Sequence, residues 1–216
     1  MNFTIRPYQP SDERHVRRLC FETALYGRPI QSVFSDEAFI SEAWLSYYWR
    51  FEPDLFWVAA DDQGVLGYLT GSADTVLFQR RYLWRIAPSL MRQFLSRRHW
   101  RQPLFRVVLR QWRTLLSCGS RSSRGFLHDF PAHCHVNVAL AARGQGVGLA
   151  LVGTFLKALR TRKIRAAHVA TATLGGSRLF RKAGFSNQCL LPAVRLTEES
   201  PTFIEILVKD LHTPES

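Results

Sequence analysis

The glycine-rich run at residues 143–148, Arg-Gly-Gln-Gly-Val-Gly, is the part of the sequence best suited to bind a ligand. It follows a predicted strand and opens a predicted helix. Glycines at such a turn remove Cβ atoms, so an anion can approach backbone N–H groups at the positive end of the helix dipole. The run therefore predicts a ligand that carries phosphate, and pyrophosphate fits it best.

Two common phosphate-binding motifs do not fit this run. A P-loop is excluded, because no Gly-Lys-Ser or Gly-Lys-Thr follows the glycines. A dinucleotide-binding fingerprint needs a third glycine and an acidic residue about 20 positions downstream. Both are missing from this sequence. The ligand is therefore expected to differ from a nucleoside triphosphate or a nicotinamide dinucleotide.

Two histidines on the strand before the run are candidates for proton transfer. His133 and His135 are two residues apart, so both side chains face the same side of a strand. An imidazole with the usual pKa of about 6.5 can take a proton from an ammonium group. Asp74 and Asp129 are alternative bases, and a structural role remains open for each histidine. A metal site at residues 133–135 is not expected, because adjacent strand residues point oppositely and no further ligands cluster there.

The glycine-rich run resembles the Q/R-x-x-G-x-G/A pyrophosphate loop of the GNAT acetyltransferases. The second hallmark of that family is a later helix that ends in a Gly-Phe step, and here Ser-Arg-Leu-Phe-Arg-Lys-Ala precedes Gly184 and Phe185. The opening order of strand, helix, helix and hairpin also matches. The resemblance covers roughly residues 1–74 and 126–210. It implies an α/β fold in which helices flank a mixed central sheet.

The resemblance further implies an N-acetyltransferase that uses acetyl-CoA and no metal. Acetyl-CoA would lie in a gap between two splayed parallel strands. A primary amine of a small-molecule or peptide acceptor would attack the thioester directly. The loop would hold the pyrophosphate, the backbone near two strand valines would pair with the pantetheine, and a threonine replaces an asparagine that faces the cofactor in many members. These residues are Arg143, Gly144, Gln145, Gly146, Val147, Gly148, Val136, Val138 and Thr173.

Phe180 departs from the family pattern, which usually has a tyrosine here that protonates the leaving thiolate. Phenylalanine has no proton to give, and a general acid contributes about 10²–10⁴ in rate. A thiol with a pKa near 8.5 is nevertheless a tolerable anionic leaving group. The ordinary role of Phe180 would be helix packing. The departure keeps open a second function, a non-catalytic acyl-CoA-binding or peripheral membrane-associated module.

A narrower resemblance lies in residues 130–138, Phe-Pro-Ala-His-Cys-His-Val-Asn-Val. This stretch is similar to the Pro-Ala-His-x-His strand of bacterial GNAT proteins related to the acetyltransferase-like domain of O-GlcNAc hydrolases. That group tends to have aspartate where this chain has Asn137. The resemblance therefore indicates a subfamily and leaves the acceptor open.

The charge is concentrated in one segment. The chain has 29 Lys and Arg against 17 Asp and Glu, a net charge of +12. Residues 75–125 contain twelve arginines and no lysine or acidic residue, and the remainder is neutral. Apolar residues at helical spacing predict two or three amphipathic helices in this insertion.

Several interpretations of the basic segment remain open. It could be a solvated helical cap on the core, a platform for an anionic membrane surface, or a site for an acidic or phosphorylated acceptor. Nucleic acid is a weaker interpretation, because apolar faces this long usually bury against something. The sequence gives no firm oligomeric state.

Length and composition indicate a globular domain. The chain of 216 residues is 46% hydrophobic and 21% charged, which fits one domain over residues 1–216 with the basic insertion. Four cysteines without a CxxC pair argue against a zinc site or a disulfide scaffold. No signal peptide and no apolar run of about 18 residues is visible. A cytoplasmic protein with reduced thiols is expected, with peripheral membrane contact as an alternative.

The expected elements alternate between strands and helices, which predicts some parallel pairing. A capping signal at Ser35 or Asp36 opens one of the helices, and Asp62, Gln63 and Gly64 form the turn of a hairpin. Strands are predicted at 3–7, 133–139, 165–173 and 203–209, the hairpin at 55–74, and helices at 11–23, 36–51, 76–86, 89–98, 104–116, 143–163 and 176–183, with a loop at 117–125.

Overall fold

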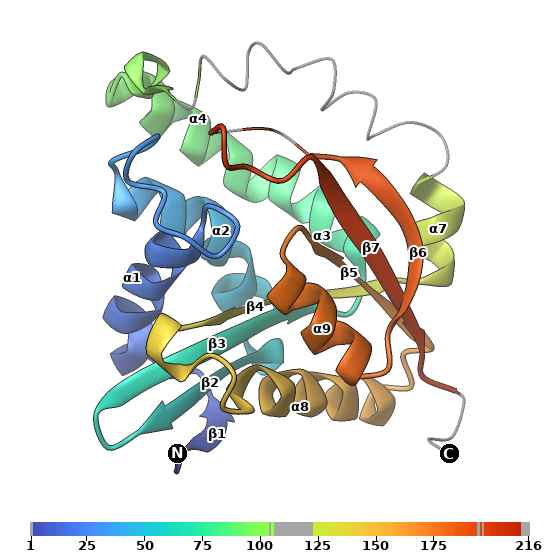
Figure 1. Ribbon diagram of the computed structural model, residues 1–216. Coiled ribbons are helices and arrows are strands. Elements are labelled where there is room, and N and C mark those ends of the chain that lie inside the picture. Colours follow the sequence, from blue (N-terminus) through green and yellow to red (C-terminus); the bar gives the residue numbers. More distant parts are fainter. Residues whose placement is uncertain (1, 104, 106–122, 194, 196, 213–216) are drawn as a thin grey trace.

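Seven strands form one mixed sheet in the computed structural model, in the order β1-β2-β3-β4-β5-β7-β6 (Figure 1). The structure describes residues 2–103, 105, 123–193, 195 and 197–212. All neighbouring strands pair antiparallel except β4 and β5, which pair parallel. The strands are β1 (Thr4–Pro7), β2 (Phe56–Asp61), β3 (Gly64–Ser72), β4 (Ala132–Val138), β5 (Ala166–Thr171), β6 (Ser186–Pro192) and β7 (Phe203–Asp210).

Helices cover both faces of this sheet. Helices α8 and α9 lie on one face, and α1 and α2 lie on the other (Figure 1). The α/β class with a mixed sheet between helices is therefore confirmed. The helices are α1 (Glu13–Thr23), α2 (Glu37–Phe51), α3 (Thr75–Arg81), α4 (Ala87–Ser96), α7 (Ser123–Asp129), α8 (Val147–Thr161) and α9 (Leu174–Lys182).

Each face of the sheet has its own apolar core. On one face, Leu151, Phe155 and Leu159 of α8 are fully buried against the central strands. On the other face, Val16 of α1 and Tyr48 of α2 pack against β2 and β3. Because side chains alternate along a strand, burial of both faces determines which side chains of each strand point toward α8 and α9 and which point toward α1 and α2.

Local signals in the sequence place most element boundaries correctly. The Asp36 side chain accepts a hydrogen bond from the backbone N–H of Phe39 at 2.9 Å and so caps α2, as predicted. Asp61 accepts hydrogen bonds from the amides of Gln63 and Gly64 in the hairpin turn. Gly64 has a φ of 137°, which favours glycine.

Strand β6 was not predicted. It pairs only with β7, at the edge of the sheet, and its residues are mostly exposed. An exposed edge strand lacks the alternation of buried and exposed residues that marks a half-buried strand. The sequence Ser-Asn-Gln-Cys-Leu-Leu-Pro therefore carries little strand signal.

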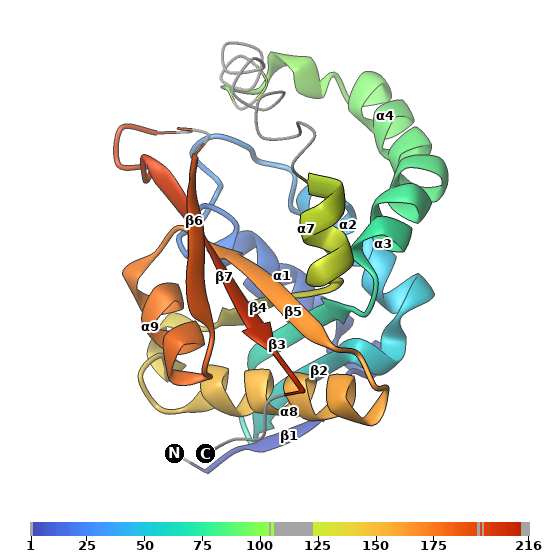
Figure 2. The same cartoon turned by 90° about the vertical axis from the view of Figure 1, so that its right-hand side faces the viewer.

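The predicted interruption between the helices at 76–86 and 89–98, which contains Pro88, is wrong. A π-helical turn at Tyr82–Ile86 joins α3 to α4 without interruption, and the amide of Ala87 donates to the carbonyl of Tyr82, five residues earlier. A proline ring normally clashes with the carbonyl four residues before it, and the wider π turn relieves this clash. In Figure 2, α3 and α4 form one curved arm along the outer edge of the molecule.

The predicted loop at 117–125 is partly corrected. Residues 123–125 are helical, because α7 begins at Ser123 and runs into β4. Residues 117–122 and nearly all of the helix predicted at 104–116 lie outside the described residues.

A pair of glycine substitutions tests the packing of α8 on the sheet. A Cβ on Gly71 of β3 would lie 2.3 Å from Cε2 of the buried Phe155, whereas a Cβ on Gly153, on the exposed side of α8, meets nothing within 4 Å. We expect Gly71→Ala to lower the free energy of unfolding by about 1–3 kcal/mol through overpacking. Gly153→Ala should raise it by about 0.5–1 kcal/mol through helix propensity. Urea unfolding measures both, and equal effects of the two variants would contradict this packing.

Candidate functional site

Strands β4 and β5 separate soon after they begin. Their parallel pairing covers only Ala132 with Ala167 and His133 with His168. Beyond these pairs, β4 stays bonded to β3 on its other side, and β5 stays bonded to β7. The β5-facing edge of β4 from Cys134 to Val138 therefore has no partner strand among the described residues. In parallel sheets, ligands bind at the carboxyl ends of such diverging strands.

The glycine-rich run lies directly after this open edge. Gly144 and Gly146 have φ values of 79° and 86°, which explains the glycines, and a Cβ on either would meet nothing within 4 Å. The backbone amides of residues 144–149 donate no hydrogen bond within the described part of the chain. These amides are thus free to bind an anion at the N-terminus of α8, which has four turns to support a dipole.

The side chain of Arg143 ties the glycine-rich run to neighbouring loops. Its Nη2 donates to the carbonyl of Gly27 at 2.8 Å, and its Nε donates to the carbonyl of Val138 at 3.1 Å. Its amide donates to the carbonyl of Leu140 at 3.3 Å, so this amide is already used. Gln145 donates to the carbonyl of Ala141 at 2.9 Å. The structure therefore gives Arg143 and Gln145 contacts that shape the loop.

His133 is buried and both of its ring nitrogens have protein partners. Thr75 donates to the carbonyl of Pro131 at 2.7 Å, so its hydroxyl oxygen accepts from Nδ1 of His133, also at 2.7 Å. Nε2 then accepts from the Tyr48 hydroxyl at 3.1 Å. Burial, with the nearby His135 and His168, holds the pKa of His133 well below its usual range. His133 is a neutral link between α2, β4 and the start of α3.

His135 faces the same side as His133, as predicted, and is only partly covered. Its ring lies edge-on to Trp44 at 5.8 Å between centroids, and Tyr48 lies 6.3 Å away. The ring has no hydrogen-bond partner among the described residues. Burial, and secondarily His168, lowers the pKa of His135 to about 4. The expectation of a pKa near neutrality is therefore wrong, and the ring is neutral at physiological pH.

His168, Trp44 and Tyr48 complete the cluster around His133 and His135, and the sequence analysis did not identify any of the three. His168 of β5 lies opposite His133 in the parallel pairing. Its Nδ1 donates to the carbonyl of Phe130 at 2.7 Å, and burial lowers its pKa. The centroid of its ring is 5.8 Å from that of His133. Only the β4–β5 register, which the sequence did not supply, brings it here.

Other predicted site residues have clear local roles. Thr173 caps α9, because its hydroxyl oxygen accepts from the amide of Gly176 at 3.0 Å. Phe180 is buried beside Phe185, which confirms helix packing and places no ionisable group there. Asp74 caps α3 by accepting from Leu77.

Asp129 is the last carboxylate that the sequence offered as a base. It is exposed at the end of α7 and lies 3.4 Å from the guanidinium of Arg165. Neither Asp129 nor Asp74 contacts the histidine cluster in the structure. The two carboxylates are therefore poorer candidates for the base than His135.

Exposed leucines lie in the segments that follow the two strands along the chain. Leu140 follows β4, Leu149 lies in the first turn of α8, and Leu174 opens α9. Leu140 and Leu174 each expose 79% of their surface. Val136 and Val138 of β4 are partly buried and pack on the core of the α8 face. Apolar side chains therefore lie close in sequence both to the unpaired edge of β4 and to the free backbone amides.

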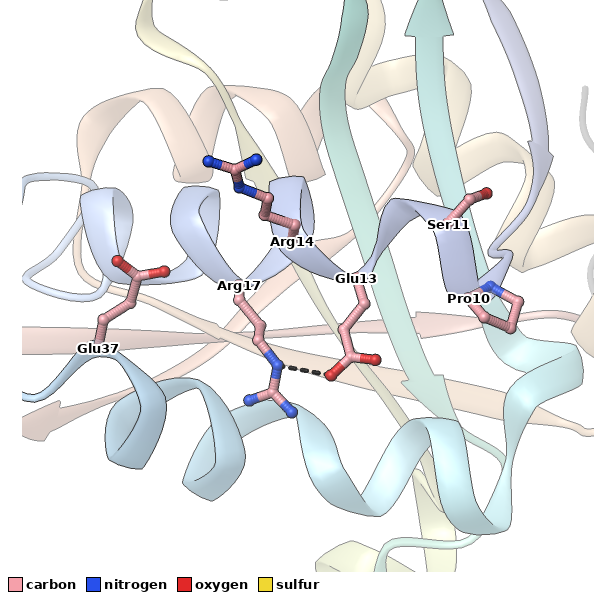
Figure 3. Close-up of a pocket in the computed structure, with 6 residues that line it drawn as sticks. All are labelled: Pro10, Ser11, Glu13, Arg14, Arg17 and Glu37. Carbon is pink, nitrogen blue, oxygen red and sulfur yellow. Dashed lines mark hydrogen bonds and ion pairs between the residues drawn. The ribbon is translucent and has the colours of Figure 1, made fainter.

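A separate hollow on the outside of α1 contains neither the glycine-rich run nor the histidines (Figure 3). Arg17 donates to Glu13 at 2.8 Å and to Ser41 at 2.9 Å, so two of its charged groups neutralise each other. Arg14 and Glu37, the other two charged residues of the lining, carry opposite charges. The hollow therefore has no excess of either charge that would select an ionic ligand. Its lining residues are Pro10, Ser11, Glu13, Arg14, Arg17 and Glu37.

The described ranges contain neither a cluster of metal ligands nor a membrane-spanning helix. No group of three or more His, Cys, Asp or Glu side chains there could hold a metal ion. None of the helices in the described part of the chain combines the length and apolar character needed to cross a bilayer.

Solved structures with the same fold are numerous, although no protein-family model matches the chain. The crystal structure of SsHAT matches with 27% sequence identity and a TM-score of 0.74, over 99% of this chain and 100% of that one. The putative acetyltransferase yncA from Salmonella typhimurium, solved with its cofactor acetyl-CoA, matches with 15% identity and a TM-score of 0.60, over 99% and 96%. A GNAT superfamily phosphinothricin acetyltransferase from Sinorhizobium meliloti, in complex with acetyl-CoA, matches with 18% identity and a TM-score of 0.58, over 97% and 89%.

These comparisons confirm the predicted GNAT fold. The matches extend over nearly the whole chain, including the strands on either side of the open edge. The subfamily related to O-GlcNAc hydrolases is not confirmed by them.

The low pKa values of the histidine cluster predict a loss of stability in acid. Each of His133, His135 and His168 binds a proton more readily in the unfolded chain, where its pKa is about 6.5, than in the folded one. The free energy of unfolding should therefore fall as the pH drops below about 6.5, by up to about 1.4 kcal/mol per pH unit for each histidine. Urea unfolding between pH 7.5 and 4.5 measures this slope.

In His135→Gln, the free energy of unfolding should fall less steeply in acid, because one of the three histidines that cause the fall has been removed. His15→Gln, on the exposed surface of α1, controls for removal of an imidazole. A slope that is the same in His135→Gln as in the parent, or an NMR titration of the His135 ring near pH 6.5, would contradict the buried neutral state.

Proposed function

We propose that this chain transfers an acetyl group from acetyl-CoA to a primary amine. The observation that carries the proposal is the set of free amides at residues 144–149, beside the unpaired edge of β4. A pyrophosphate would accept hydrogen bonds from these amides at the N-terminus of α8. The GNAT fold, and neighbours solved with acetyl-CoA, support this assignment.

The pantetheine arm of acetyl-CoA would enter the gap between β4 and β5. Its two amide groups would pair with the open backbone edge of β4 near Val136 and Val138. The pantetheine arm would thus take the place of a neighbouring strand. Leu140 and Leu174 would cover its methylene groups. Thr173 uses its oxygen to cap α9, and its hydroxyl hydrogen is available for a contact with the cofactor.

His135 is the residue that we assign as general base. It is the histidine of the cluster whose ring nitrogens are unbonded among the described residues, and it is neutral at physiological pH. The amine nitrogen attacks the thioester carbonyl carbon, a proton passes from the nitrogen to His135, and the C–S bond breaks. The electron pair of that bond leaves on sulfur as the thiolate of CoA.

His133 is assigned a positioning role in place of the catalytic role considered from the sequence. Its ring is held by Tyr48 and Thr75, and it leaves no free nitrogen for an acceptor. The centroid of its ring lies 5.9 Å from that of His135, so the held ring of His133 restricts the orientation of His135.

A non-catalytic acyl-CoA-binding module is the second candidate function. The specific observation in its favour is Phe180, which is buried in the core and cannot protonate a leaving thiolate. Thiolate departure without a general acid is slower, yet it is tolerable because the pKa of a thiol is near 8.5. Binding of acetyl-CoA is expected under both functions, whereas release of free CoA with an amine is expected only for the enzyme.

The subfamily related to O-GlcNAc hydrolases remains part of the proposal. Its supporting residues are those of the strand Pro-Ala-His-Cys-His, which form β4. Asn137, where that group tends to have aspartate, donates to the Tyr68 hydroxyl at 2.6 Å. An aspartate in this place would instead accept a hydrogen bond from the Tyr68 hydroxyl, so Asn137 reverses the direction of the hydrogen bond.

Gly146→Glu tests whether the glycine-rich run binds the cofactor. The new carboxylate would stand in the open space that the amides face and would repel a pyrophosphate. We expect calorimetric affinity for acetyl-CoA to fall at least about a hundredfold, because binding of a dianion at a helix N-terminus is lost. Gly153→Glu, on the exposed side of α8, adds the same charge and should leave the affinity unchanged. Equal affinity in Gly146→Glu and the parent would rule out this loop.

His135→Gln tests the base. We expect kcat to fall about 10²–10⁴-fold with an amine substrate, while the affinity for acetyl-CoA changes little. Because the pKa of His135 is lowered to about 4, its protonation should reduce the parent rate only in acid. Any rise of kcat/KM above neutral pH should follow the pKa of the chosen amine. An unchanged kcat in the variant would remove His135 from the mechanism without affecting the assignment of the loop.

A further inference from the structure

The outer face of the arm made by α3, the π turn and α4 carries large apolar side chains that stay exposed. Trp84 exposes 72% of its surface, Leu83 exposes 61% and Met91 exposes 58%. Val76 and Leu95 extend the same stripe, since the five residues recur at helical spacing. A contiguous apolar stripe of this kind on a protein surface marks an interaction site.

The arm cannot turn this stripe inward, because its other side is already packed. Ile86 and Leu90 are buried against the body of the protein. The Tyr82 hydroxyl donates to the carbonyl of Ala43 in α2 at 2.8 Å. Figure 2 shows the arm along the outer edge of the molecule, away from the sheet. The π turn adds a residue to one turn, so Leu83 and Trp84 both face solvent.

Arginines alternate with the apolar residues of the stripe. Arg80, Arg85 and Arg92 are exposed and make no ion pair within the described residues, and no acidic residue occurs between positions 75 and 125. Arg97, at the end of α4, is instead paired with Asp36 at 2.7 Å. The face therefore combines unneutralised positive charge with apolar surface.

This combination distinguishes between the partners that the sequence left open. A solvated cap would bury its apolar residues and expose only arginines, which is not the arrangement seen at Leu83 and Trp84. Nucleic acid is bound chiefly through phosphate contacts of basic side chains and gains little from exposed leucine and methionine. An anionic bilayer uses both features, because it offers negative headgroups above an apolar interior.

We propose that the outer face of α3 and α4 binds an anionic membrane surface. The arm would lie in the plane of the interface, with Leu83, Trp84 and Met91 inserted among the acyl chains. Arg80, Arg85 and Arg92 would reach the lipid phosphates with their guanidinium groups, while their methylene stems stay in the apolar layer. Attachment would be peripheral and reversible.

Sedimentation of the full chain with vesicles tests the proposal. One set of vesicles contains phosphatidylcholine with about one-third phosphatidylserine, and the other contains phosphatidylcholine alone. We expect binding to the anionic vesicles at 0.1 M salt, where the Debye length is about 10 Å, and partial retention at 1 M, where it is about 3 Å. The retained part reports the apolar contact, since salt does not screen it. Tryptophan fluorescence should shift to the blue on binding, and less so in Trp84→Gln.

Two variants separate the apolar and charged contributions. Leu83→Gln with Trp84→Gln should weaken partitioning at least tenfold and abolish retention at 1 M salt. Leu190→Gln is the matched control, because Leu190 is 58% exposed on β6 and lies outside the arm. Changing Arg80, Arg85 and Arg92 to Gln should weaken binding about fivefold per residue, whereas Lys at the same positions should restore it. Circular dichroism confirms that each variant is folded.

Several results would overturn the proposal. The first is no sedimentation with anionic vesicles at 0.1 M salt. The second is complete release at 1 M salt with no effect of the Leu83 and Trp84 changes, which would mean a purely electrostatic contact. The third is a dimer in analytical ultracentrifugation that the Leu83 and Trp84 changes dissociate, without vesicle binding, which would make the stripe an interface between two copies.

Discussion

The early end of the parallel pairing between β4 and β5 is the constraint on which the rest of the site depends. A buried strand edge leaves backbone N–H and C=O groups that need partners. Here β4 is held on one side by β3, and β5 is held on the far side by β7, so neither strand can turn to pair further. The gap is therefore fixed by the flanking antiparallel pairs, and an amide-bearing ligand or water must complete it.

The helices that follow the two strands gain their chemistry from the same separation. Helix α8 is the next α-helix after β4, beyond a short turn and the glycine-rich run, and α9 begins three residues after β5 ends at Thr171. The core under α8 keeps this arrangement rigid, because Leu151 and Phe155 are fully buried against the sheet. The glycine-rich run can then present unpaired amides without a side chain in front of them. Tight packing of α8 on the sheet thus holds in place its exposed N-terminus, where the free amides lie.

Short-range signals made most of this fold predictable. Capping by Asp36, the turn after Asp61 and the glycine-rich start of α8 are all local, and each predicted an element that the structure contains. Strand β6 and the continuous arm through Pro88 were not predictable in the same way. The first depends on pairing with β7, and the second depends on a π turn that sequence periodicity does not reveal.

In the candidate site, too, the residues that local sequence identifies differ from those that only long-range packing brings together. The residues of the glycine-rich run are contiguous, so their spacing carried the prediction, whereas His168 and Tyr48 join the site only through long-range packing. The pKa of His135 also depends on burial among those residues, so the ordinary value of a free histidine, expected from residue type alone, does not apply. A pattern of residue types can identify a histidine as a base, but the surroundings decide how strong a base it is.

The lowered pKa values within the histidine cluster also constrain the acceptor. Burial is the main cause for all three rings. Neighbouring histidines lower the pKa values of His133 and His135 further, whereas the hydrogen bond to the Phe130 carbonyl partly opposes the shift of His168. A site of this kind disfavours positive charge, so an ammonium group would lose its hydration on entry. None of the groups that shift these three pKa values is an anion that would offset that cost. The amine that reacts would then arrive neutral or lose its proton at the entrance. His135 would be left to accept the second proton, the one that the nitrogen sheds as the new amide forms. Its lowered pKa makes it a weak base, but it also keeps the ring unprotonated and therefore able to take this proton at neutral pH.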